Sequence, residues 1–328
     1  MSRFDEDLQK IREHSKTMMD MLEQSGEWEA SFDAEEIPGR IQGALLGLAI
    51  GDAMGAATEF MEPDEIRREF GKVTDFQGGG WLNLLPGQTT DDTAMTVCVA
   101  EGIIENPESP IESIGRAFLR WNADSPPDIG ITIRQTLQNY RGDWFAAAQQ
   151  THFDLDGRSA GNGSLMRCLP IALAYQDLET MEKVTVLQSK MTHYDDLASE
   201  ACVLYNRIAH DVLRGTHLRY AIVDHAANTR YQNVFFNRPS CSPDGYVVNT
   251  LTWVLYLLWN FHSFQEVILE ATNEGYDADT VAAIAGGLSG LFHGVGAIKS
   301  TKDWVERLQD ADRLGSLAEE LFQLRQSQ

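Results

Sequence analysis

Cysteine is scarce in this chain of 328 residues, and the four cysteines, Cys98, Cys168, Cys202 and Cys241, lie far apart. No CxxC pair is present, which excludes the usual zinc-ribbon pattern, and the spacing does not fit a dense disulfide framework. We therefore predict that the four thiols are reduced and buried in the core of a cytoplasmic protein.

Long apolar runs are also missing. Residues 1–20 are charged and contain no apolar segment, so we expect no Sec-type signal peptide. The longest apolar stretch, residues 247–261, contains Asn249 and is too short to span a bilayer. These features predict a protein without a membrane-spanning segment.

Basic residues are few, with 26 Lys and Arg against 49 Asp and Glu, and the formal net charge is −23. Such a chain repels nucleic acid phosphates and anionic membranes, so we expect no nucleic acid or membrane partner. It suits metal cations and basic protein surfaces, although an acidic surface also serves solubility alone. The 43% of hydrophobic residues is ample for a large core.

Residues 1–38 differ from the rest of the chain. Apolar residues at three- and four-residue steps predict an amphipathic helix over 4–22, and the acidic segment 27–36 that follows carries Trp28 and Phe32. Pro38-Gly39 predicts a break. This arm either folds back on its own domain or binds a basic cleft on a partner protein. We therefore divide the chain into an acidic arm, 1–38, and a main domain, 39–328.

Helical periodicity dominates the main domain, and strand alternation is weak. A glycine-striped helix is expected over 40–60 and a loop-rich segment over 61–88, with short strands possible at 73–81 and 231–238. We predict one all-α domain. The further helices are expected at 92–105, 110–122, 129–139, 144–151, 165–176, 179–191, 196–214, 216–228, 248–260, 263–273, 280–292 and 302–325.

Two helices carry small residues at four-residue spacing, which places the small residues on one side of each helix. Glycine is unfavourable inside a helix unless another group must come close. We expect both helices to pack in the core, and packing against each other would bring the start of the domain near residue 277. The two stripes are Gly43, Gly47, Gly51 and Gly55, and Ala282, Gly286, Gly290 and Gly294.

Two oxygen-rich segments precede apolar helices at distant places in the sequence. Thr90-Asp91-Asp92 alone reads as a helix cap, because Thr and Asp favour the first turn. Asp277-Ala278-Asp279-Thr280 precedes the second glycine-striped helix in the same way. Carboxylates and hydroxyls are the ligands that hard divalent cations prefer, so the two helix starts could face each other and form a two-metal site.

A glycine-rich loop, Gly161-Asn162-Gly163-Ser164, also precedes a predicted helix. Its amides and hydroxyl could hold a phosphate, although such a loop is commonly a simple turn, and the Walker A pattern is absent. His193 could contact substrate or could be a capping or core histidine. His210-Asp211 is similar to the HD pair of phosphohydrolases, but no matching histidine ligands accompany it.

Together these motifs resemble the ADP-ribosylglycohydrolase family. The resemblance covers residues 39–300 and implies an all-α fold with two Mg²⁺ or Mn²⁺ ions. Five blocks carry it in the family's order, namely 43–55, Thr90-Asp91-Asp92-Thr93, 160–167, Thr192-His193 and Asp277-Ala278-Asp279-Thr280.

The resemblance also implies roles for individual residues. Glu59 matches the family's glutamate near the metals and, with Asp91 and Asp279, is expected to be catalytic. Gly161, Asn162, Gly163 and Ser164 match the loop that handles the diphosphate of ADP-ribose, and His193 a substrate-side histidine. Tyr276 departs from the family, which commonly has glycine there, so its ring is expected to contact substrate or narrow the cleft. The residues that match metal ligands are Thr90, Asp91, Asp92, Asp277, Asp279 and Thr280.

The resemblance predicts a metal-dependent hydrolase that removes ADP-ribose from proteins, with arginine as the expected acceptor. It is also expected to act as an antidote, an immunity protein against an ADP-ribosyltransferase that the 1–38 arm binds. The alternative is a catalytically weak binding protein that blocks a partner's active site through residues 1–38. A hydrolase of free nucleotides or of ADP-ribosylated nucleic acid fits less well, because of the charge of −23.

Overall fold

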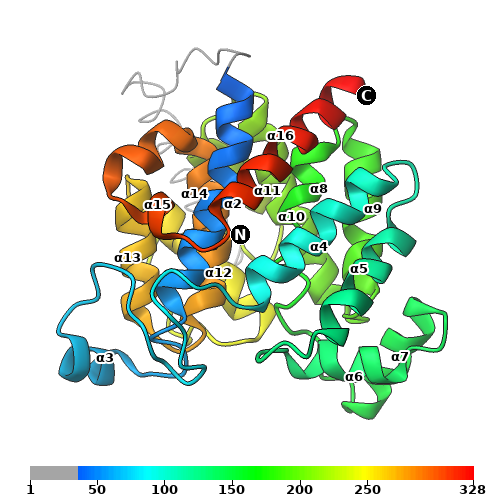
Figure 1. Cartoon of the computed structure of the whole chain (residues 1–328), viewed down its shortest axis with the longest axis horizontal. Helices are drawn as coiled ribbons and strands as arrows, with labels where there is room; N and C mark the ends of the chain where they lie inside the picture. Colours follow the sequence, from blue (N-terminus) through cyan, green and yellow to red (C-terminus); the bar gives the residue numbers. More distant parts are fainter. Residues whose placement is uncertain (1–35) are drawn as a thin grey trace, which may run out of the picture.

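The computed structural model describes residues 36–328, and every regular element among them is an α-helix (Figure 1). The predicted all-α fold class is therefore confirmed. The arm predicted over 1–38 lies outside the described residues, except for residues 36–38. The helices are α2 (Ile37–Gly55), α3 (Pro63–Phe70), α4 (Asp91–Glu105), α5 (Ile111–Ala123), α6 (Ile131–Asn139), α7 (Trp144–Asp154), α8 (Leu169–Ala174), α9 (Leu178–Lys190), α10 (Asp196–Leu213), α11 (Leu218–Ala226), α12 (Val247–Asn260), α13 (Phe264–Glu274), α14 (Ala278–Thr301), α15 (Trp304–Arg307) and α16 (Ala311–Ser327).

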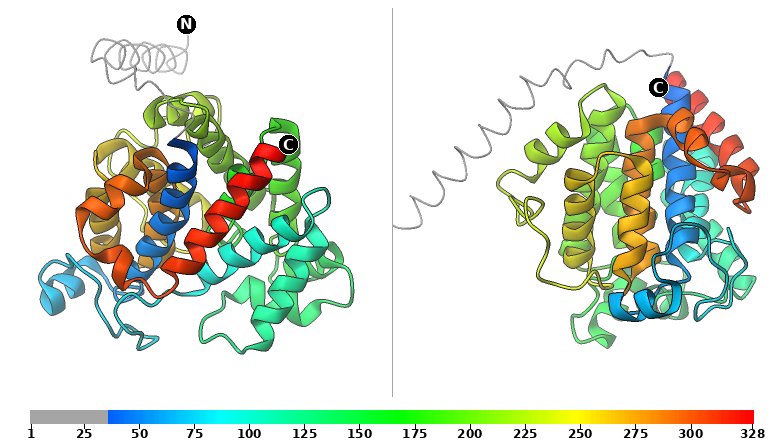
Figure 2. Two further views of the ribbon diagram at one scale, coloured as in Figure 1. Left: turned by 45° about the horizontal axis from the view of Figure 1, so that its top comes forward. Right: turned by 90° about the vertical axis from the view of Figure 1, so that its left-hand side faces the viewer.

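The antiparallel pair α2 and α14 runs through the middle of the molecule (Figures 1 and 2). A Cβ on Gly47 would lie 2.4 Å from the carbonyl oxygen of Gly286, and one on Gly290 would lie 2.1 Å from that of Gly43. Only glycine allows backbones to come this close. The expected contact between the two small-residue stripes is confirmed, and it carries the end of α2 to the start of α14.

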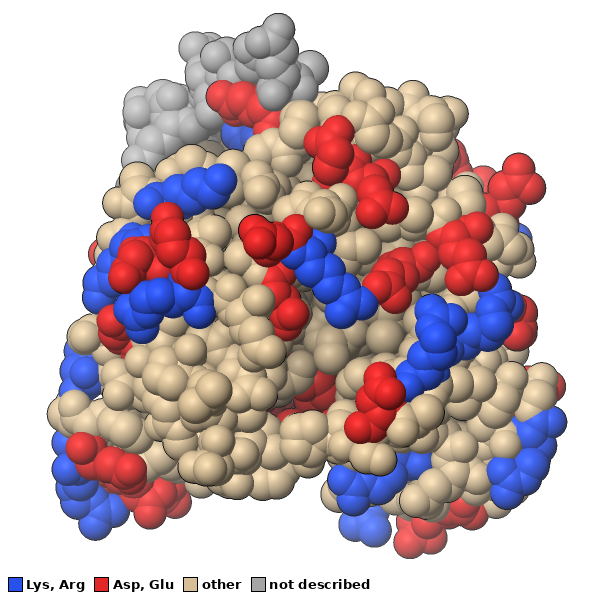
Figure 3. All heavy atoms as spheres, viewed as in Figure 1, with Lys and Arg blue, Asp and Glu red and all other residues tan. Residues whose placement is uncertain are grey.

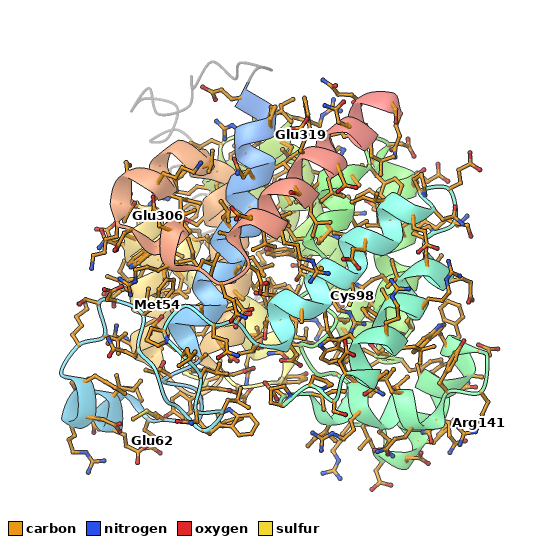
Figure 4. All side chains as sticks on the ribbon, in the orientation of Figure 1. Met54, Glu62, Cys98, Arg141, Glu306 and Glu319 are labelled. Carbon is orange, nitrogen blue, oxygen red and sulfur yellow. The ribbon has the colours of Figure 1, made fainter. Side chains whose placement is uncertain are left out.

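Nearly every side chain of α2 from Ile41 onward is buried, because neighbouring helices cover this helix on all sides. Met54, near its end, and Cys98, in α4, both lie in the interior (Figure 4). Helix α14 is long and apolar enough to cross a membrane, but 72% of its most apolar window is buried inside the protein. This burial is typical of the core helix of a globular domain.

Four sequence-based expectations were wrong in detail. Helix α3 occupies part of the segment expected to be loop-rich, and Pro63 begins this helix. Pro38 likewise lies in the first turn of α2, not at a break. The segments 73–81 and 231–238 form no strand; among the described residues only the isolated bridges Gly79–Leu84 and Gly161–Tyr246 occur. The helix expected over 302–325 is divided into α15 and α16.

Candidate active site

A cavity of about 630 Å³ opens between the part of the molecule that carries α3 and the part that carries α6 and α7, and acidic atoms lie in this hollow (Figure 3). The cavity walls come from the end of α2, the start of α4, the start of α6, the loop before α8 and the start of α14. Six carboxylates line it, and Arg134 is the one Lys or Arg among the described lining residues. The carboxylates belong to Glu59, Asp91, Asp128, Asp244, Asp277 and Asp279.

The starts of α4 and α14 meet beside this cavity. Thr280, in the first turn of α14, donates its hydroxyl to Oδ2 of Asp92 at 3.2 Å, and the Thr90 hydroxyl lies 3.3 Å from the same oxygen. The other oxygen of Asp92, Oδ1, is buried and has no hydrogen-bond partner. A buried carboxylate oxygen without a partner is costly, and a cation would satisfy it.

Glu59, Asp277 and Asp279 form an acidic group in the cavity. One carboxylate oxygen from each lies within 4.8 Å of the others, which is the arrangement needed to hold a metal ion. Asp277 precedes α14, and Asp279 lies in its first turn, where the helix dipole favours negative charge. The residues therefore fit a hard divalent cation.

Burial and mutual repulsion raise the pKa values of these carboxyl groups. Burial raises the pKa of Glu59 to about 8, the Trp81 hydrogen bond opposes this shift and the charge of Asp277 adds to it. Burial also raises the pKa of Asp277 to about 6 and holds the pKa values of Asp91 and Asp279 well above the usual range. A site with so much unbalanced negative charge needs protons or metal cations.

Asp52 supports the start of α4, although the sequence did not single it out as a site residue. Its carboxylate accepts the backbone N–H groups of Thr90 and Thr93, each at 3.0 Å, and the Thr93 hydroxyl. Asp52 is buried inside the apolar helix α2. A charged residue within a buried apolar run is unusual, and this signal could have revealed it.

Asp128 is a second residue that sequence reasoning missed. It follows Pro126-Pro127 in the loop before α6 and faces Asp91, with which it shares a hydrogen bond. Two carboxyl groups can form such a bond only when one of them is protonated. Burial raises the pKa of Asp128, but the shared hydrogen bond lowers it and raises that of Asp91, so without a metal ion Asp91 is the donor of this bond. No periodicity or cluster in the sequence marks this position.

The loop before α8 faces the same cavity. A Cβ on Gly163 would lie 3.1 Å from the His193 ring, so glycine lets the loop approach this histidine. Asn162 donates to Asp277 at 2.6 Å and to Thr250 at 3.0 Å, which ties the loop to the acidic group. Ser164 differs from the prediction, because its hydroxyl is buried and lies 3.0 Å from Ser189.

The His193 ring lines the cavity and is almost fully buried. Burial lowers its pKa to about 3, so the imidazole is neutral. Its Nδ1 lies 2.8 Å from the Thr192 hydroxyl, which itself accepts a hydrogen bond from the buried Arg167 at 2.7 Å. Donation of the Thr192 hydroxyl proton to Nδ1 corresponds to the tautomer with the His193 proton on Nε2, and acceptance from Nδ1–H corresponds to the other tautomer.

Aromatic residues form the wall near Glu59. The Trp81 indole N–H donates to the Glu59 carboxylate, and the Trp81 and Phe60 ring centroids are 5.5 Å apart. Tyr276 lines the cavity with a φ of 57°, and its N–H donates to the carbonyl of Met61 at 2.8 Å. Tyr276 therefore joins the two loops that carry Glu59 and Asp277.

The His210-Asp211 pair lies outside this cavity. His210 Nε2 is 3.0 Å from the carbonyl oxygen of Gln176, and Asp211 is 2.7 Å from His225 Nε2. The pair therefore serves contacts among α10, α11 and the loop before α9, and the weak likeness to a phosphohydrolase motif has no counterpart in the cavity.

Comparisons with known proteins give matches over most of the chain. The sequence model of the ADP-ribosylglycohydrolase family matches residues 33–328. The chain is 34% identical over 272 residues to the ADP-ribosyl-[dinitrogen reductase] glycohydrolase of Rhodospirillum rubrum, covering 82% of this chain and 90% of that protein. It is 33% identical to the ADP-ribosylarginine hydrolase Tri1 of Pseudomonas putida, covering 88% and 79% of the two chains. A solved ADP-ribosylglycohydrolase-related protein complex superposes with a TM-score of 0.77 at 30% identity, over 89% of this chain and 99% of that one.

Proposed function

The chain belongs to the ADP-ribosylglycohydrolase family and is a hydrolase of ADP-ribose glycosidic linkages, and we propose that it removes ADP-ribose from arginine side chains of proteins. The observation that carries the proposal is the convergence of two distant acidic helix starts, joined by the Thr280–Asp92 hydrogen bond, on a cavity large enough for a nucleotide.

Two Mg²⁺ or Mn²⁺ ions fit this site for two reasons. Among the residues that the structure describes, the cavity is lined by six carboxylates and a single arginine, so its negative charge is unbalanced, and Oδ1 of Asp92 has no hydrogen-bond partner. When bound, such ions supply a clamp for the ribose diol and acidify a water. The proposed ligands are Thr90, Asp91, Asp92, Asp277, Asp279 and Thr280.

The remaining roles fall to side chains around the cavity. We assign the Gly161–Gly163 loop, Arg134 and the His193 ring, which all line the cavity, to binding the diphosphate end of ADP-ribose. Their carboxylate neighbours supply a negative field that favours the oxocarbenium-like charge of the transition state. Glu59, which bound cations would keep deprotonated, is our candidate to accept a proton from the attacking water.

When Asp91 binds a metal ion as a carboxylate, the proton of the Asp91–Asp128 hydrogen bond lies on Asp128, which can give it to the leaving guanidine. Arginine is favoured as acceptor because the acidic cavity attracts a guanidinium. Two of the similar proteins bear the name ADP-ribosylarginine hydrolase, which agrees with this choice.

The test is an assay of ADP-ribose release from arginine-modified and serine-modified protein, with and without EDTA. We expect release from the arginine conjugate alone, loss of release in EDTA and recovery on adding Mn²⁺ or Mg²⁺. Asp91→Ala and Asp279→Ala should abolish release while circular dichroism stays unchanged. Full activity in both variants, or in EDTA, would refute the proposal.

We also propose that the 1–38 arm binds an ADP-ribosyltransferase, which would make the protein an antidote that both blocks and reverses modification. The acidic segment 27–36 with its two aromatic residues supports this idea by its composition. Charge reversal at Glu27, Glu29 and Asp33 should abolish capture of the transferase while ADP-ribose release continues. Capture that is insensitive to these changes would exclude the arm.

A further inference from the structure

A second cavity, of about 300 Å³, lies near the start of α2 and the kink of α14, at the end of this helix pair opposite to the active site. Apolar side chains, three histidines and an arginine line it, while no carboxylate lines it among the described residues. This is unusual on a chain with a net charge of −23. The lining residues used below are His217, Arg219, Phe261, His262, Phe292 and His293.

The basic groups are held on the rim by contacts with their neighbours. Arg219 donates to Nδ1 of His262 at 2.7 Å, and the His217 ring packs edge-on against Phe292 with centroids 4.8 Å apart. The carboxylate of Glu266, outside the lining, accepts the backbone N–H groups of His262 and Ser263 at the start of α13. Burial lowers the pKa of His293 to about 4, so the cavity offers an apolar recess beside the Arg219 guanidinium and the imidazole rings.

The chain enters the described structure next to this cavity. Arg40 pairs with Glu36 at 3.2 Å and donates to the carbonyl oxygen of Phe292 at 2.6 Å. Residue 36 is thus about one helical turn from a residue of the cavity wall. An extended chain advances about 3.5 Å per residue, so Phe32 can reach about 14 Å from Glu36 and Trp28 about 28 Å.

The segment that ends at Glu36 complements the cavity in its charge and in its aromatic residues. Residues 27–36 contain five carboxylates, no basic residue and two large aromatic rings, Trp28 and Phe32. We propose that the 27–36 segment docks in cis on this cavity, with an aromatic side chain in the recess and its acidic neighbours beside Arg219 and the histidines. Aromatic anchors flanked by charges of opposite sign are a common basis of such recognition.

Docking of the 27–36 segment at this cavity leaves the active site accessible to substrate. Helix α2 has 19 residues and is about 28 Å long, and the active site lies at its other end. A partner that recognises the 27–36 segment must first displace it from the cavity. The apparent affinity for that partner is then reduced in proportion to the fraction of molecules whose 27–36 segment is undocked. The strength of docking at this cavity therefore controls how readily the partner binds.

The test uses the full chain and hydrogen exchange followed by mass spectrometry. We expect amides of 27–36 to exchange at least about tenfold more slowly than in a free peptide of the same sequence, or about 1.4 kcal/mol of docking. Arg219→Glu should remove this protection. The matched control is Arg141→Glu, an exposed arginine near α6 and α7 (Figure 4), which should not.

A reciprocal pair of variants keeps the test valid if Arg219→Glu disturbs the fold. Trp28 and Phe32 belong to the 1–38 arm and not to the main domain. At least one of the variants Trp28→Ser and Phe32→Ser should speed amide hydrogen exchange at residues 217–219 and 261–262. Hydrolysis of ADP-ribosyl-arginine should be unchanged in both. Peptide-like exchange of 27–36 in the wild type, or protection that all these variants retain, would refute the docking. Protection that disappears on dilution would show that a second copy, not the same chain, supplies the segment.

Discussion

The indole N–H of Trp81 donates a hydrogen bond to the Glu59 carboxylate at the edge of the active-site cavity. Trp81 follows three glycines, and a Cβ on Gly80 would lie 2.6 Å from the carbonyl oxygen of Ala56, so this loop packs directly on the end of α2. The packing of Gly80 on Ala56 therefore places Trp81 where its indole can hold the side chain of Glu59.

Trp81→Phe should lower kcat about tenfold or more while KM changes little. The phenyl ring keeps the contact with Phe60, but the donor to Glu59 is lost, and a hydrogen bond to a charged group contributes about 1.5–3 kcal/mol. A loss confined to kcat indicates an interaction made in the transition state. Steady-state kinetics on ADP-ribosyl-arginine measure this. Trp121→Phe, in α5 outside the cavity, is the matched control, and equal kcat in both variants would contradict the role.

Metal removal should make stability fall as pH rises. Burial raises the pKa of Asp52 and Asp277 from 3.8 to about 6 and that of Glu59 from 4.5 to about 8. The metal-free native state then holds more protons than the unfolded state between about pH 4 and 8, so its stability is greatest at the acid end of this window and declines through it.

Thermal unfolding in EDTA should accordingly give a higher Tm at pH 5.5 than at pH 8.5. Added Mn²⁺ should raise Tm more at pH 8.5, because the ion no longer competes with protons for the carboxylates. Asp279→Asn should reduce this gain. A gain from Mn²⁺ that is the same at both pH values would contradict the linkage.

Gly47→Ala should destabilise the fold by about 1–3 kcal/mol. The new methyl group would lie 2.4 Å from the Gly286 carbonyl oxygen, and overpacking of this kind outweighs the helix propensity of alanine, which is worth about 1 kcal/mol. Gly296→Ala is the control, because nothing lies within 4 Å of its Cβ position. Urea denaturation should show a loss for the first variant and none for the second; equal curves would show that the stripe contact is unimportant.

The central helix pair and the acidic helix starts could be predicted because both depend on local spacing. Four-residue steps place Gly47 and Gly286 on helix faces whatever the rest of the chain does. Helix α3 was missed because its pattern is dominated by charge, with Ile66 as its one buried residue. Trp81 and Asp128 lie in loops, where position depends on tertiary contacts and no periodicity exists to reveal it.

Asp52→Asn should weaken Mn²⁺ binding about 10–100-fold without removing a proposed ligand. The Asp52 carboxylate accepts three donors from Thr90 and Thr93, and an amide would oppose one N–H group with another. Outer groups that orient metal ligands commonly have effects of this size. Calorimetric titration with Mn²⁺ measures it. Asp310→Asn is the control, since Asp310 accepts from the neighbouring Thr89 at 3.3 Å outside the cavity; equal affinities in the two variants would exclude the supporting role.

Thr192→Val should raise KM about tenfold with a smaller effect on kcat. The Thr192 hydroxyl accepts from Arg167 and lies 2.8 Å from His193 Nδ1, and we expect it to donate to Nδ1, which would keep the imidazole proton on Nε2. Valine removes this relay, so the imidazole can adopt the tautomer that presents an acceptor to the diphosphate. Thr192→Ser keeps the hydroxyl and should restore KM. Nitrogen chemical shifts of His193 report the tautomer directly, and an Nε2–H form that persists in Thr192→Val would show that another contact sets it.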